Sequence, residues 1–190
     1  AISDEMIRPI SAAEREVVAS RLSSLPDAPV SSRRPGDDWT TAFSATWEGP
    51  NDLPTLAFGN YLEPDSRPDG ATCGTSQLVR PDTTGTRYAA PQPLEPGYCT
   101  LSILFSDWGR TGTRDLRVTN DRHYAADADD QLWQVAPGEP PRLYGADDGW
   151  RPLQLWGMGI ASRDLTGDGY PEVFITSQGD NKLQTLDGDD

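Results

Sequence analysis

The sequence predicts an all-β protein, and three observations lead to this fold class. The 190 residues include 18 glycines and 17 prolines, which interrupt helices and favour turns. Short stretches rich in β-branched and aromatic residues lie between these turns, as strands would. Similar stretches also recur: Trp47, Asp107 and Asp164 occupy equivalent positions, at spacings of 60 and 57 residues.

Residues 1–37 differ from the remainder and are predicted to contain one short helix. Ser11 and Glu14 form a capping box that opens a helical stretch over residues 12–25. Pro26 ends this stretch, and an extended connection follows. We expect this segment to precede the repeats without a function of its own.

From residue 38 onward the chain divides into three repeats, 38–97, 98–154 and 155–190, of which the third is incomplete. Each is expected to form a strand, a polar loop and a second strand. A third strand is predicted at residues 75–79, 131–135 and 182–186.

A period of this length with three or four strands suits a β-propeller blade better than a sandwich. Three blades are too few to close a ring, so the sequence predicts a portion of a larger propeller. The remaining blades would be supplied by further chain or by another chain.

The third repeat contains the acidic stretch Asp164-Leu165-Thr166-Gly167-Asp168-Gly169-Tyr170-Pro171-Glu172. Its oxygen-bearing side chains alternate, as in tight loops that surround calcium with six to eight hard oxygens. The glycine at position 6 permits a sharp reversal. The predicted ligands are four side chains and one backbone carbonyl, those of Asp164, Thr166, Asp168 and Glu172 and the carbonyl of Tyr170.

An EF-hand would share this loop opening, but it requires a glutamate at position 12 and a following helix. Position 12 is Ile175, within a β-branched and aromatic stretch. We therefore predict a calcium loop within a β-hairpin, the alternative being an Asp/Gly turn without metal.

The corresponding loops of the other repeats are poorer in ligands. Repeat two keeps acidic residues only at Asp107 and Asp115, and its Arg110 and Arg114 could replace a metal by pairing with them. In repeat one, the loop that begins at Trp47 has lost the pattern.

Residues 157–164 and 168–175, together with 114–121, resemble the FG-GAP/VCBS repeat of integrin α-subunit propellers. They are more similar still to bacterial proteins of the cartilage-acidic-protein (ASPIC/UnbV-like) group. The resemblance covers residues 38–190, strongly in repeat three and weakly in repeat one. It implies a seven-bladed propeller, secreted or surface-exposed, with calcium between the first two strands of a blade.

Charge and cysteine content indicate partners and compartment. The net charge of −14 disfavours nucleic acid and anionic membrane surfaces, and no apolar run is long enough to span a membrane. Cys73 and Cys99 lie in turn-like contexts, where a disulfide is the preferred interpretation and two unrelated thiols the alternative. We therefore expect an extracytoplasmic protein, whether secreted, periplasmic or at the cell surface.

No catalytic constellation stands out in the sequence. His123 is the only histidine and is expected in a loop, and Asp127, Asp129 and Asp130 are expected to form a solvated acidic loop. The six tryptophans are expected to pack in the core, a carbohydrate-stacking platform being the alternative.

The leading hypothesis is thus a calcium-binding, non-enzymatic propeller segment that binds a protein or a glycan. The alternative is part of a secreted propeller enzyme, a polysaccharide hydrolase or lyase, whose active site is formed mainly by blades outside this segment.

Overall fold

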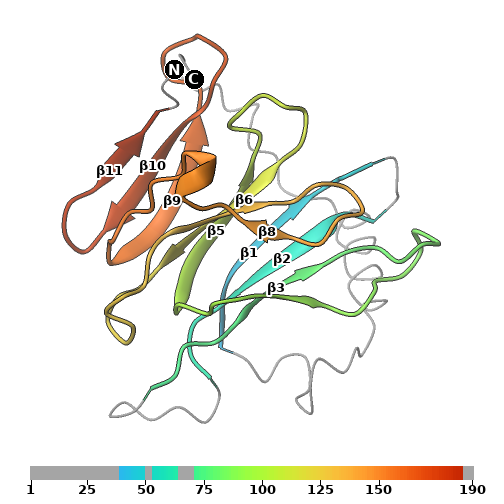
Figure 1. Cartoon of the computed structure of the whole chain (residues 1–190), viewed down its shortest axis with the longest axis horizontal. Coiled ribbons are helices and arrows are strands. Elements are labelled where there is room, and N and C mark those ends of the chain that lie inside the picture. Colours follow the sequence, from blue (N-terminus) through green and yellow to red (C-terminus); the bar gives the residue numbers. More distant parts are fainter. Residues whose placement is uncertain (1–38, 50–52, 64–70, 186–190) are drawn as a thin grey trace, which may run out of the picture.

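The computed structural model describes residues 39–49, 53–63 and 71–185, and this part of the protein consists almost entirely of β-strands (Figure 1). Eleven strands in the described residues form three antiparallel sheets. Beside them lies a single turn of 3₁₀ helix, η2 (Ala146–Asp148). The predicted all-β class is confirmed, whereas the helix predicted over residues 12–25 falls outside the described residues.

Strand order within each sheet follows the sequence, so that each strand pairs with the one before it. Sheet 1 consists of β1 (Thr40–Thr46), β2 (Thr55–Asn60), β3 (Ser76–Val79) and β4 (Gln92–Leu94). Sheet 2 consists of β5 (Thr100–Ser106), β6 (Asp115–Asn120), β7 (Gln131–Gln134) and β8 (Arg142–Leu143). Sheet 3 consists of β9 (Gly157–Arg163), β10 (Glu172–Ser177) and β11 (Lys182–Gln184).

The first hairpins of the three sheets share their strand lengths and their register. In each, a seven-residue strand pairs with a six-residue strand. The extra residue is accommodated at the second position of the longer strand, at Thr41, Leu101 and Met158. Trp47, Asp107 and Asp164 therefore each follow the last residue of the first strand.

The sheets pack face to face along their first strands, because β1 contacts β5 and β5 contacts β9. Side chains alternate along β6, so that this strand contributes to both interfaces of sheet 2. Leu116 and Val118 enter the largest core cluster, which sheets 1 and 2 share. Arg117 and Thr119 point the other way, where Arg117 donates a hydrogen bond to Gln184 of β11.

The two outermost sheet faces carry exposed apolar side chains. On sheet 1, Phe43 is 56% exposed beside Phe58, its cross-strand neighbour. On sheet 3, Phe174 is 40% and Leu183 53% exposed, and the two are paired across β10 and β11. Apolar side chains fill the interface between sheets 1 and 2, and they are also present on the outer faces of sheets 1 and 3.

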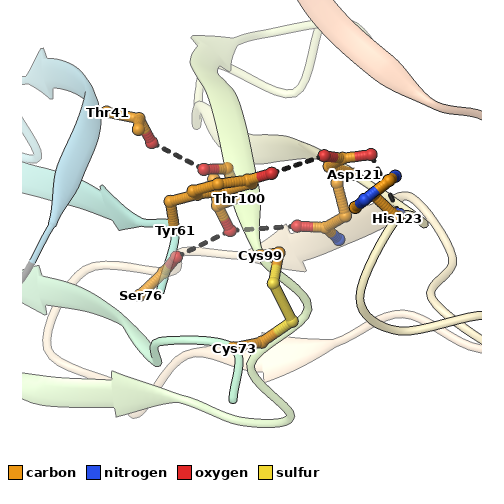
Figure 2. Close-up of a disulfide and its surroundings, with 9 residues drawn as sticks. Thr41, Tyr61, Cys73, Ser76, Cys99, Thr100, Asp121 and His123 are labelled. Atoms are coloured by element: carbon orange, nitrogen blue, oxygen red, sulfur yellow. Dashed lines mark hydrogen bonds between the residues drawn. A yellow bond between two sulfur atoms is a disulfide. The ribbon is translucent and has the colours of Figure 1, made fainter. Parts of the chain in front are cut away.

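Cys73 and Cys99 form a disulfide, as predicted. Cys73 lies in the connection between β2 and β3, and Cys99 directly precedes β5, so the bond ties sheet 1 to sheet 2 (Figure 2). Beside it the Thr100 hydroxyl hydrogen-bonds Asn120 and Ser76, at 2.9 and 2.8 Å. A covalent bond and a buried polar network therefore hold the same junction.

Candidate metal centre

Asp164 folds the predicted calcium loop around its own carboxylate. Its Oδ1 accepts a hydrogen bond from the Gly167 N–H at 2.6 Å, and its Oδ2 accepts one from the Gly169 N–H at 2.9 Å. Both glycines have positive φ, +81° and +92°, where a side chain would introduce strain. One carboxylate and two glycines thereby produce the sharp turn that the sequence predicts.

Glu172 closes the loop from its other end, as the first residue of β10. Although only 4% exposed, its carboxylate reaches back into the loop. Oε2 accepts a hydrogen bond from the Leu165 N–H at 2.6 Å, and Oε1 accepts one from the Thr166 hydroxyl at 3.3 Å. Thr166 and Glu172, two predicted ligands, are therefore in direct contact.

Asp168 adopts a different orientation from the other predicted carboxylates. Its Oδ1 accepts a hydrogen bond from the Tyr170 N–H at 2.8 Å, within its own turn. In the described part of the chain, no three acidic, histidine or cysteine side chains converge as ligands of one ion. The loop is therefore organised around Asp164 and Glu172, and Asp168 would have to rotate to join them.

The donor set nonetheless fits calcium in its chemistry. The five predicted ligands, Asp164, Thr166, Asp168, Tyr170 and Glu172, offer carboxylate, hydroxyl and carbonyl oxygens, the hard donors that calcium prefers. They lie within nine consecutive residues, of which Glu172 alone is buried.

Arg110, from the loop of sheet 2, reaches the acidic loop of sheet 3. Its Nη1 lies 3.4 Å from the Asp168 carbonyl oxygen, and its guanidinium carbon lies 5.1 Å from the centre of the Tyr170 ring. An open groove lies between these loops, lined by Asp107, Arg114, Asp164 and Pro171 among others. The positive charge of Arg110 thus lies beside the acidic loop at residues 164–172.

The loop of repeat two begins like that of repeat three, with an aspartate that accepts hydrogen bonds from backbone N–H groups, but its last carboxylate does not fold back into the loop. Asp107 accepts hydrogen bonds from the N–H groups of Thr111 and Gly112, at 2.8 and 3.1 Å. Asp115 instead accepts a hydrogen bond from the Tyr144 hydroxyl at 3.0 Å, and burial raises the pKa of its carboxyl. Because its second carboxylate is engaged elsewhere, this loop lacks the closure that Glu172 provides.

The sequence suggested that Arg110 and Arg114 could replace a metal in repeat two by pairing with its aspartates, and the structure does not show this pairing. No ion pair among the described residues joins Arg110 or Arg114 to Asp107 or Asp115.

In repeat one, the Glu48 carboxylate pairs with Arg80 at 2.8 Å and accepts a hydrogen bond from the Thr55 hydroxyl at 2.6 Å. Its charge is thereby neutralised within its own sheet.

At the opposite ends of the strands, Tyr61 and His123 both hydrogen-bond Asp121 beside the disulfide (Figure 2). The Tyr61 hydroxyl donates to Asp121 Oδ2 at 2.6 Å, and burial is the main cause that raises the Tyr61 pKa. His123 lies in a turn, as expected, and its backbone N–H donates to Asp121 Oδ1 at 3.0 Å. The Trp39 ring packs edge-on against Tyr61 at 5.5 Å.

Two sequence expectations about side-chain burial are only partly met. Trp133 and Trp150 are buried, but three tryptophans are largely exposed, Trp39, Trp47 and Trp156. The acidic stretch at residues 127–130 is not wholly solvated, because Asp130 is only 3% exposed. Thr119 donates to its Oδ1 at 2.9 Å, whereas Oδ2 is buried without a protein partner.

A buried arginine, Arg117, escaped the sequence analysis. It is 3% exposed and lies against the rings of both Trp108 and Trp150, 5.5 and 4.8 Å from their centres. Burial lowers its pKa to about 10. The alternation of β6 would have suggested an inward side chain at this position, but not a partner 67 residues away in Gln184.

Comparison with protein-family models gave no match for this chain. Comparison with curated proteins gave none either. The resemblance to FG-GAP/VCBS repeats therefore has no support beyond residues 114–121, 157–164 and 168–175 themselves.

Proposed function

We propose that this chain is a segment of a calcium-stabilised β-propeller that acts outside the cytoplasm as a binding module for a protein or a glycan. Its three sheets would be successive blades. Support comes from three sheets with the same strand order and the same hairpin register, in contact through their first strands.

The acidic loop is the observation that carries the calcium part of the proposal. Calcium would be held by the side chains of Asp164, Thr166, Asp168 and Glu172 and by the Tyr170 carbonyl. When bound, the ion supplies positive charge that offsets three neighbouring carboxylates. Asp164 and Glu172 already hold the loop closed through backbone N–H groups, so little rearrangement beyond Asp168 is needed.

The disulfide supports an extracytoplasmic location, because disulfides persist in oxidising compartments and are rare in reducing ones. No helix in the described part of the chain is long and apolar enough to cross a membrane.

Calorimetric titration with calcium tests the proposal, with magnesium as the competing ion. We expect binding to one loop, and a gain in stability of about 2.7 kcal/mol at a hundred times Kd. Asp168→Asn should abolish both effects while leaving the metal-free stability within about 0.5 kcal/mol. Its side chain is exposed, and asparagine can still accept the Tyr170 N–H.

Asp107→Asn is the matched control, because Asp107 opens the related loop of repeat two. It should lower stability but leave the calcium titration unchanged. A wild-type chain that gives no heat and no shift in melting temperature with calcium would refute the proposed function. Calcium-dependent retention on immobilised glycans or candidate proteins then tests the binding role.

A further inference from the structure

The side chain of Arg110 is aimed from one sheet into the loop of the next. Its backbone has φ +52°, a left-handed conformation uncommon for residues other than glycine. From there the guanidinium meets the Asp168 carbonyl and covers the Tyr170 ring. The loop of sheet 2 thus presents a cation to the loop of sheet 3.

Gly169 leaves the space that this contact needs. A Cβ at this position would lie 2.6 Å from Arg110 Nη1. The same Gly169 donates its N–H to Asp164 Oδ2 at 2.9 Å. Arg110 contacts the carbonyl of the peptide unit whose N–H binds the Asp164 carboxylate, so the cation lies against the loop that would hold the proposed calcium ion.

Arg110 brings a positive charge to this contact. Arg110 is exposed, so the high dielectric constant of water weakens its field. Two unit charges about 4 Å apart in water interact by about 1 kcal/mol, and a divalent ion doubles this, so repulsion at a somewhat larger separation would weaken binding about five- to tenfold. That is large enough to decide whether a calcium site is filled at a given concentration.

We propose that Arg110 sets the calcium affinity of the acidic loop by acting as a competing cation supplied by the neighbouring sheet. This inference rests on the proposed function, since it concerns calcium at residues 164–172. Coupling is reciprocal, so calcium weakens the Arg110 contact as much as Arg110 weakens calcium binding. Occupancy of the loop would then be linked to the junction of sheets 2 and 3.

Calcium titrations of three variants separate charge from position. Arg110→Gln removes the cation and should bind calcium about five- to tenfold more tightly than the wild type. Arg110→Lys keeps the charge and should stay within about twofold. Arg114→Gln, the matched control, removes the same charge from the same loop without a contact to Asp168 or Tyr170, and should also change affinity less than about twofold.

Ionic strength gives an independent check. The difference between the wild type and Arg110→Gln should shrink as salt rises, because screening shortens the range of the repulsion. In the wild type, the Arg110 Nε–H resonance should also shift on addition of calcium.

These measurements test the role of Arg110 separately from calcium binding by residues 164–172. Calcium binding by the wild type with equal affinities for Arg110→Gln and Arg114→Gln would overturn the role of Arg110 and leave the calcium loop standing. Calcium binding by the wild type, together with tighter binding by Arg110→Gln than by Arg114→Gln, would support both. No binding by any variant would overturn both.

Discussion

At the scale of single residues, the two aspartates that open the loops do the same structural work. Asp164 and Asp107 each accept two backbone N–H hydrogen bonds from the turn that follows. Such charge-assisted bonds are stronger than neutral ones. Each loop is therefore organised before any ligand binds.

We expect Asp164→Asn to lower the free energy of unfolding by about 1 kcal/mol in the absence of calcium. An amide offers one acceptor oxygen, so one of the two N–H groups of Gly167 and Gly169 would turn to water. Urea denaturation of the metal-free protein measures the change. Asp168→Asn, which keeps its hydrogen bond, serves as the reference, and equal losses in the two variants would contradict the assignment.

Asp130 should make stability depend on pH. Burial raises its pKa to about 6, the nearby Arg117 and the Thr119 and Asn120 hydrogen bonds oppose this, and Asp129 reinforces it. Because the folded pKa lies above the unfolded value near 3.9, the group stabilises the fold most below about pH 4, and this contribution is lost as pH rises through 6.

Asp130→Asn resembles the protonated form, so the variant should gain stability relative to wild type between pH 4 and 7. The expected relative gain is about 3 kcal/mol, from a pKa difference of about two units. Urea denaturation at several pH values measures it. A difference between the two proteins that does not vary with pH would contradict the buried ionisation.

At the scale of strands and sheets, one glycine sets how closely sheets 2 and 3 approach. A Cβ on Gly157, the first residue of β9, would overlap the Thr119 hydroxyl of β6 and lie 2.9 Å from its Cβ. We expect Gly157→Ala to destabilise the protein by about 1–3 kcal/mol, since the packed sheets must separate to admit a methyl group.

Gly145→Ala is the control, because a Cβ there meets nothing within 4 Å and its φ is −128°. It should change the free energy of unfolding by less than about 0.5 kcal/mol. Thermal melts of the two variants compare them directly. If both lost the same amount, close approach at Gly157 would not be the cause.

The disulfide constrains the junction between sheets 1 and 2. Its cysteines are 26 residues apart, and closing a loop of that length removes about 3.5 kcal/mol of entropy from the unfolded chain. The double variant Cys73→Ala/Cys99→Ala should lose about that amount in chemical denaturation. A reducing agent should destabilise the wild type similarly and leave the variant unchanged, whereas an effect on both would point to another cause.

At the scale of the whole molecule, the stack of sheets ends in apolar surface. Phe174 and Leu183 on sheet 3, like Phe43 on sheet 1, are exposed to an extent that a continuing stack would reduce. We expect the folded chain to bind an apolar fluorescent dye and Phe174→Ser/Leu183→Ser to bind it more weakly. Unchanged fluorescence would place the dye elsewhere.

Local patterns made much of this architecture predictable. The hairpins follow from β-branched and aromatic stretches around polar loops, and Asp164 to Glu172 could be recognised because the donors are neighbours in sequence. The short strands β4 and β8 were missed, since they are two or three residues long and Pro93 lies within one of them.

Contacts between sheets were beyond such patterns. Arg110 meets Asp168 58 residues away, and Arg117 meets Gln184 67 residues away. No local spacing marks either pair, because packing of separate sheets decides it. The sequence pattern also could not predict that the Asp168 carboxylate turns toward the Tyr170 N–H, because the pattern identifies carboxylates by position and not by orientation.

Because every sheet formed by residues 39–49, 53–63 and 71–185 is a meander of consecutive strands, none of their backbone ladders joins distant parts of the chain. This has a kinetic consequence. Each sheet can assemble as its stretch of chain becomes available, with little loop-closure entropy to overcome, and only docking depends on its neighbour. During synthesis sheet 1 could therefore serve as a template for sheet 2, and sheet 2 for sheet 3, so that the molecule would grow in the order in which it is translated.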